Sequence, residues 1–134
     1  MTDNSCIIRN FQLMKHIFDN NDVLVTYYKL TKKEISVIQE LCMKHNSFKA
    51  YIECSISDFR ISRKSFYRAL DKLENENILN VVNRPKNQHS SLQVYFTIKF
   101  IQKVCDEEFA NLYEQWLTWR KDCITQGDKN GKDI

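Results

Sequence analysis

The sequence predicts a mainly helical α+β fold that contains one small β-hairpin. Three observations lead to this prediction. Apolar residues recur at helical spacing in several segments, a polar turn separates two strand-like stretches, and both glycines fall within the last eight of 134 residues. Phosphate-binding loops and strained nucleophile turns need glycine, so the folded part excludes the P-loop, the dinucleotide-binding fingerprint and the nucleophile elbow.

The first third of the chain contains two predicted helices. Ile7–Phe18 repeats apolar residues at helical spacing and ends at the polar run 19–22. We interpret the short apolar stretch Val23–Tyr28 as an extended lead-in. Thr31 and Glu34 form a capping box that opens a second helix, which we expect to end near residues 45–46. The residues that this helix is expected to bury are Ile35, Ile38, Leu41 and Cys42.

The middle of the chain contains short elements followed by one well-defined helix. Residues 49–53 fit a small strand, and Ser55 begins a very short helix with Asp58 at its third position. Ser62 then caps a helix over 63–75, because its hydroxyl can accept an amide hydrogen bond from the first turn. The predicted inward face of this helix consists of Phe66, Ala69, Leu70 and Leu73.

A β-hairpin and a closing helix complete the predicted elements. Strands are expected over 78–84 and over 92–98, with a polar turn between them. The closing helix runs from Asp106 to about Trp119, and the helix dipole favours the acids at its start.

Length and composition predict one domain. We expect a single domain over 1–125 and a disordered tail over 126–134, since domains cluster near 100–150 residues and polar termini are often disordered. The first residues lack the basic and apolar regions of a signal peptide, and no apolar run is long enough to cross a membrane. The net charge of +3 decides nothing by itself, because function depends on where the cations lie.

The cysteines are interpreted as reduced thiols packed in the interior of a cytoplasmic protein. Their number is odd, no CxxC pair occurs, and the three histidines do not supply zinc-ligand spacing. We therefore expect neither a metal nor a cofactor. The cysteines are Cys6, Cys42, Cys54, Cys105 and Cys123.

The predicted elements follow the order of a winged helix-turn-helix. In that fold the helix after the turn enters the DNA major groove, and the hairpin, or wing, touches the adjacent backbone or minor groove. Five cations and one acid lie between residues 60 and 72, a local balance of +4 that exceeds the charge of the whole chain. The predicted DNA-binding residues are Arg60, Ser62, Arg63, Lys64, Ser65, Tyr67, Arg68, Lys72, Arg84, Lys86 and Asn87.

Different members of this set are expected to contact phosphates and bases. Phosphate contacts supply most of the affinity and make it salt-dependent through counterion release. The side chains expected to supply them are Arg60, Lys64, Lys72, Arg84 and Lys86. Arginine is the usual reader of guanine, and the residues expected to contact bases are Arg63, Tyr67 and Arg68.

The stretch SISDFRISRKSFYRALDKLENENIL resembles the helix-turn-helix of winged-helix regulators and of plasmid or phage replication initiators. The resemblance covers residues 30–100 and implies that Ser62 caps the recognition helix. The flanking helices resemble those of MarR/Sar-type regulators, which implies a homodimer formed by the terminal helices. The wing departs from that family, since NQHSS stands where an Asp-x-Arg element is usual.

Two DNA-binding hypotheses follow. The first is a dimeric transcription regulator that binds duplex DNA, because the two terminal helices are more apolar than a lone winged domain needs. The second is a replication or mobile-element accessory factor that binds single-stranded or origin DNA and docks a polymerase or helicase. The aromatic residues that could stack on bases in the second case are Tyr67, Tyr95, Trp116 and Trp119.

A third hypothesis is a winged helix used only for protein contact, with Trp116 and Trp119 as its anchor. An enzyme is the weakest interpretation, so we expect no catalytic activity. The polar residues that might have suggested one show no partner spacing in the sequence. They are His45, Glu53, Cys54 and Asp58.

Overall fold

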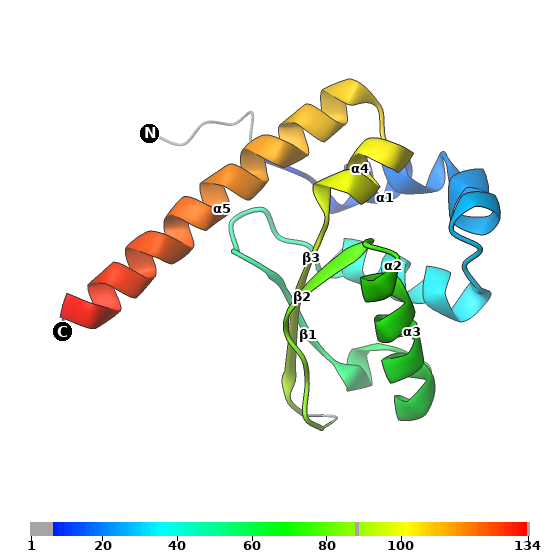
Figure 1. Ribbon diagram of the computed structural model, residues 1–134, viewed down its shortest axis with the longest axis horizontal. Coiled ribbons are helices and arrows are strands. Elements are labelled where there is room, and N and C mark those ends of the chain that lie inside the picture. The colour runs from blue at the N-terminus through cyan, green and yellow to red at the C-terminus, as the bar shows by residue number, and fades with distance from the viewer. Residues whose placement is uncertain (1–6, 88, 134) are drawn as a thin grey trace.

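The computed structural model describes the backbone of residues 7–87 and 89–133, and the side chains of residues 7–87 and 89–122. Its architecture is mixed α+β, with α2 and α3 on one side of a three-stranded antiparallel sheet (Figure 1). The helices are α1 (Asn10–Phe18), α2 (Lys32–Lys44), α3 (Arg63–Asn75), α4 (Ile98–Val104) and α5 (Glu107–Asp133). The strands are β1 (Ile52–Ser55), β2 (Leu79–Asn83) and β3 (Ser91–Phe96).

The capping box predicted for α2 is confirmed. The amide of Glu34 donates to Thr31 Oγ1 at 3.3 Å, and the amide of Thr31 donates to Glu34 Oε1 at 2.8 Å. Both bonds satisfy amides that lack a partner within the helix, which fixes the first turn. The helix ends at Lys44, one residue before the predicted end.

The bounds predicted for α3 are confirmed, and its inward face is buried as expected. The amide of Ser65 donates to Ser62 Oγ at 3.1 Å, which caps the helix. Because apolar side chains recur at i, i+3, i+4 and i+7, one face of α3 is sealed against the core and the opposite face is left to solvent. The buried residues are Phe66, Ala69, Leu70 and Leu73.

The sheet has the strand order β1-β3-β2, with both pairs antiparallel. In β3 burial alternates as a half-buried strand requires, with Leu92, Val94 and Phe96 inside. A register shift between Val81 and Asn83 interrupts the β2–β3 pairing just before the hairpin tip. The first strand lies at 52–55 and is thus shifted from the predicted position, 49–53.

Two segments differ from their predicted form. Val23–Tyr27 is a π-helical turn and not an extended lead-in, because helical geometry lets Leu24 and Tyr28, four residues apart, both point inward. Residues 98–104 form α4, whereas the sequence predicted a strand that ends at residue 98 and no element over 99–104. Thr97 stops the strand and caps α4, since its Oγ1 accepts the amide of Phe100 at 3.1 Å.

The closing helix α5 is capped by Asp106, whose Oδ1 accepts the amide of Phe109 at 2.8 Å. The helix continues to Asp133, past the end predicted near Trp119. The tail predicted over 126–134 thus falls on the last turns of α5 up to residue 133. Residue 134 and the side chains from residue 123 onward lie outside the described part.

Three cysteines are buried free thiols, as predicted: Cys42, Cys54 and Cys105. Burial raises the pKa of Cys54 and of Cys105 to about 12, and raises the pKa of Cys42 further. Cys6 and the side chain of Cys123 lie outside the described residues. Within the described part, no helix is both long and apolar enough to cross a bilayer, and no cluster of acidic, histidine or cysteine side chains could hold a metal ion.

Candidate nucleic-acid interface

The outward face of α3 carries a row of cations near its N-terminal end. Arg63, Lys64 and Arg68 are exposed, and Arg60 is exposed in the turn that precedes the helix. Among the described residues, no carboxylate lies within ion-pair distance of any of these four side chains. The structure therefore brings together the cations that the sequence predicted for one surface, and leaves their charge available to a ligand.

The first turn of α3 also receives a cation from α2 that the sequence did not predict. Lys33 Nζ donates to Ser65 Oγ at 3.3 Å, and Ser62 Oγ donates to the same oxygen at 3.0 Å. Lys33 and Ser65 are 32 positions apart, so no local spacing could reveal this contact. Only the packing of α2 against α3 adds Lys33 to the surface.

Arg60 lies beside α2, where it borders a shallow hollow of about 280 Å³ together with Ser36, Gln39 and Glu40. Polar groups of α2 therefore lie beside Arg60, the cation that precedes α3. Hydroxyl and amide groups commonly supplement cations in phosphate contacts. The candidate surface thus extends from α3 onto α2.

The tip of the β2–β3 hairpin contributes a second polar region. Lys86 and Asn87 are exposed there, as predicted. The carbonyl of Asn87 accepts the amide of Ser90 at 3.1 Å, and its Oδ1 accepts the amide of His89 at 2.8 Å. Asn87 therefore shapes the turn through its own side chain and leaves Lys86 as the exposed cation of the tip.

Tyr67 and Arg84 lie at the junction between α3 and the hairpin. Tyr67 Oη donates to the carbonyl of Pro85 at 2.8 Å, and the Arg84 guanidinium lies 5.8 Å from the centre of the Tyr67 ring. Arg84 also forms ion pairs with Asp71 and with Glu74, the latter at 3.4 Å. These side chains are therefore already engaged within the protein, and their DNA contacts stay predictions.

The remaining predicted cation of α3, Lys72, pairs with Glu76 at 3.9 Å, one helical turn away. The helix is thus divided along its length. Its N-terminal half carries cations without acidic partners among the described residues. Its C-terminal half carries two acids that pair with Arg84, and Lys72, which pairs with the C-cap residue Glu76.

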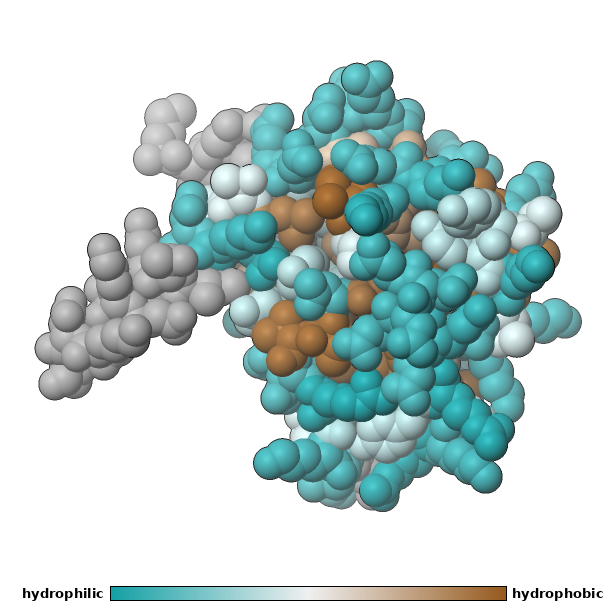
Figure 2. All heavy atoms as spheres, in the orientation of Figure 1, coloured by the Kyte–Doolittle hydropathy of each residue, from teal (hydrophilic) through white to brown (hydrophobic). Residues whose placement is uncertain are grey.

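The two polar regions lie at the same end of the molecule. In Figure 1 the first turn of α3 and the hairpin tip both lie at the lower end, whereas α4 and the start of α5 lie at the upper end. This lower end is mostly hydrophilic on the face drawn in Figure 2. A single extended polyanion could therefore touch both regions.

Most aromatic residues proposed to stack on bases are occupied inside the protein. Trp116 is buried, and its Nε1 donates to the carbonyl of Ser47 at 2.8 Å. The Arg120 guanidinium covers the ring of Tyr95 at 3.7 Å. Trp116 therefore cannot serve as the exposed stacking platform or protein anchor that the sequence suggested, and Trp119 is the more accessible of the two tryptophans.

The terminal helices use most of their apolar residues within one chain. His16 of α1 stacks on Phe109 of α5 with ring centres 4.2 Å apart, and Tyr113 is fully buried. Among the described residues the exceptions are Phe11 of α1, with 68% of its surface exposed, and Trp119 of α5, with 36% exposed. The surplus of apolar residues that suggested a dimer is thus largely explained by packing of the single chain.

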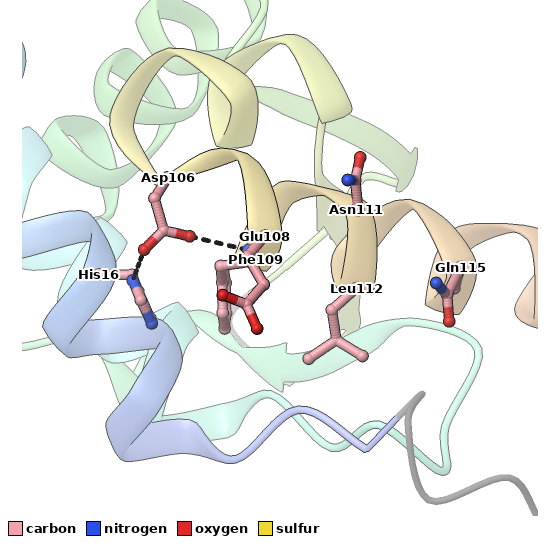
Figure 3. A pocket seen from close by; sticks show the side chains of 7 residues that line it. All are labelled: His16, Asp106, Glu108, Phe109, Asn111, Leu112 and Gln115. Atoms are coloured by element: carbon pink, nitrogen blue, oxygen red, sulfur yellow. Dashed lines mark hydrogen bonds and ion pairs between the residues drawn. The ribbon is translucent and has the colours of Figure 1, made fainter.

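A second hollow, of about 530 Å³, lies between α1 and the start of α5 (Figure 3). Its wall includes His16, whose Nδ1 lies 3.7 Å from Asp106 Oδ2, and the exposed acid Glu108. Asp106 also caps α5, so its carboxylate has a structural function at this position. The acids give this hollow a charge opposite to that of the α3 surface.

Comparison with known proteins does not place the chain in a family. No family model, no curated protein and no solved structure matches it. The function proposed below therefore rests on the residues and on their arrangement.

Proposed function

We propose that the chain is a non-enzymatic, cytoplasmic DNA-binding protein of the winged helix-turn-helix class, and that it regulates transcription. In this proposal α3 enters the major groove and the β2–β3 hairpin acts as the wing. The order of α2, β1, the short 3-10 helix Ile56–Asp58, α3 and the hairpin supports the assignment, as does the pairing of β1 with β3, the second hairpin strand.

One observation carries the proposal: the exposed cations around the N-terminal half of α3 have no acidic partner in the described part of the chain. Unpaired surface cations favour a polyanion, because their contacts with phosphate release condensed counterions. In the proposal Lys64, Lys33 and Lys86 contact phosphates. Arg63 and Arg68, which project from the helix expected in the groove, contact bases.

Duplex DNA is favoured over a single strand. Binding to single strands depends on aromatic platforms that stack on the bases. Trp116 is buried, Tyr95 is covered by Arg120, and Tyr67 is held by the hairpin. Trp119, the fourth residue of that set, is exposed but lies on α5 and not on α3. The exposed groups of the α3 surface are cationic and hydrogen-bonding, which suits a groove and a phosphate backbone.

The test is fluorescence anisotropy with labelled duplex and single-stranded DNA of the same sequence, each measured across a salt series. We expect tighter binding to the duplex, with an affinity that falls steeply as salt rises. Tighter binding to the single strand would instead indicate a replication accessory factor. Absence of binding to either at low salt would overturn the proposal and favour a protein-contact module.

A homodimer through α1 and α5 belongs to the same proposal. A symmetric dimer would place two copies of α3 about 34 Å apart, one DNA turn. Light scattering of the free protein tests it, and replacing the exposed Phe11 with Ser should shift a dimer toward monomer. A wild-type monomer at all concentrations would contradict the dimer and leave DNA binding by a single copy.

A further inference from the structure

We infer that Arg84 is a positioning residue, which clamps the wing to the recognition helix and does not itself contact phosphate. This inference rests on the proposed function. The clamp consists of Tyr67, Asp71, Glu74, Arg84 and Pro85, and we call it the α3–wing clamp.

The contacts of the clamp join two elements that are far apart in the chain. The guanidinium of Arg84 reaches two carboxylates, Asp71 and Glu74, which lie three residues apart on the same face of α3. Its planar group also lies over the Tyr67 ring at 5.8 Å. A guanidinium suits this position, because it can bond to several carboxylate oxygens while presenting a flat face to a ring.

A second link runs beside the first. Tyr67 Oη donates to the carbonyl of Pro85 at 2.8 Å, and Pro85 itself is buried. Proline fixes its own φ angle, so anchoring this carbonyl restrains the direction in which the chain leaves β2. Lys86 and Asn87 follow directly, so the clamp sets where the wing tip lies relative to α3.

The β2 side of the hairpin needs this support, because β2 is an edge strand that pairs only with β3, whereas β3 is held on both sides. β1 pairs with β3 from Ser91 to Val94, and the β2–β3 pairing is irregular between Val81 and Asn83. Next to the tip, Asn83 Nδ2 donates to the carbonyl of Ser91 at 2.7 Å. In the described residues, the clamp is what connects the chain beyond Asn83 to α3.

The clamp predicts that removing the acids Asp71 and Glu74 changes DNA affinity in the direction opposite to the usual one. Removing an acid near a DNA-binding surface ordinarily tightens binding, since it removes repulsion of phosphate. If Asp71 and Glu74 hold Arg84 in place, their removal releases the wing and weakens binding. If Arg84 contacts phosphate instead, their removal frees a cation and strengthens binding.

The experiment compares D71N/E74Q, R84A and the matched control E76Q in duplex binding across a salt series. Glu76 directly follows α3 as its C-cap residue and pairs with Lys72, outside the clamp. We expect D71N/E74Q and R84A to bind about ten-fold more weakly, with a salt slope lower by about 0.9 as Lys86 loses its phosphate. E76Q should bind as tightly as the wild type or more tightly. Equal or tighter binding by D71N/E74Q would overturn the clamp.

A second measurement needs no DNA. Hydrogen exchange of residues 79–96 in the free protein should be faster in D71N/E74Q and in R84A than in E76Q, because the released hairpin opens more often. Unchanged exchange in the two clamp variants would overturn the inference. If the wild type binds no DNA, the proposed function fails, while this measurement still decides whether the clamp exists.

Discussion

Basic side chains lie in opposite environments in two regions of the molecule, the exposed face of α3 and the buried region under α5. On the N-terminal half of α3, Arg63 and Arg68 are exposed, and no described carboxylate pairs with them. In the region that α5 covers, His45 and Arg120 are only 2% and 3% exposed. Both ring nitrogens of His45 and the Nε of Arg120 lack a hydrogen-bond partner among the described residues.

The difference shows why total charge says little about function. An exposed cation stays hydrated at little cost and can exchange its counterions for phosphate. Burial instead lowers the pKa of His45 to about 4, so this histidine is neutral at pH 7. Arg120 cannot lose its proton and is held over the rings of Tyr95 and Tyr51, at 3.7 and 5.3 Å.

The largest expected effect on DNA binding comes from removing the two exposed arginines of α3. The double variant Arg63→Ala/Arg68→Ala should lose about 2–6 kcal/mol of duplex binding, since each base-reading arginine contributes about 1–3 kcal/mol. It should also lose its preference among DNA sequences. Competition binding with a randomised duplex pool measures both effects.

The matched control for this double variant is Lys99→Ala, which removes an exposed cation from α4. It should bind as the wild type does. If the double variant loses affinity but keeps its sequence preference, both arginines contact the DNA backbone and not the bases.

In the buried region, the protonation of His45 should make the stability of the protein depend on pH. The unfolded chain takes up a proton on this histidine below about pH 6.5, whereas the folded protein takes it up only near pH 4. The free energy of unfolding should therefore fall as pH drops between these values, by about 2 kcal/mol from pH 7 to pH 5. Urea unfolding at the two pH values measures the fall.

The variant His45→Phe separates this effect from other titrations. Phenylalanine keeps a ring against Tyr113 and Trp116 but cannot be protonated. The fall between pH 7 and pH 5 should be smaller in the variant by the contribution of His45. An equal fall in both proteins would show that His45 does not carry the pH dependence.

The smallest expected effect sharpens the comparison within α3. Lys72 is paired with Glu76, so removing both in Lys72→Ala/Glu76→Ala leaves the local charge unchanged. We expect an unchanged salt slope for this pair, whereas Lys64→Ala should lower the slope by about 1. Equal slopes for the two variants would mean that pairing does not decide which lysine contacts DNA.

Local signals in the sequence predicted much of the fold. The caps at Thr31 and Ser62 and the apolar face of α3 were correct, because each depends on residues within one or two helical turns. The missed α4 and the π-helical turn depend on how Phe100 and Leu24 reach the core from neighbouring elements. Tertiary packing therefore overrode the strand-like composition of these segments.

The candidate site likewise has features that the sequence could predict and features that arise only from tertiary packing. The sequence placed the cations of α3 on one outward face, since helical spacing alone decides that arrangement. Spacing could not reveal that Lys33 joins this face or that Arg84 is held by Asp71 and Glu74. Nor could it reveal that Trp116 is buried against the carbonyl of Ser47. These contacts span 10 to 69 positions and arise only when the elements pack.

The strand order β1-β3-β2 has a consequence for how the chain is made. The central strand of the sheet is the last of the three in the sequence, and Glu53 of β1 meets Gln93 of β3 across 40 positions. During synthesis β1 therefore emerges from the ribosome without a partner and stays unpaired until Ser91–Phe96 has been made. Helices α2 and α3 can pair earlier, so sheet closure is the long-range, slow event that completes the fold.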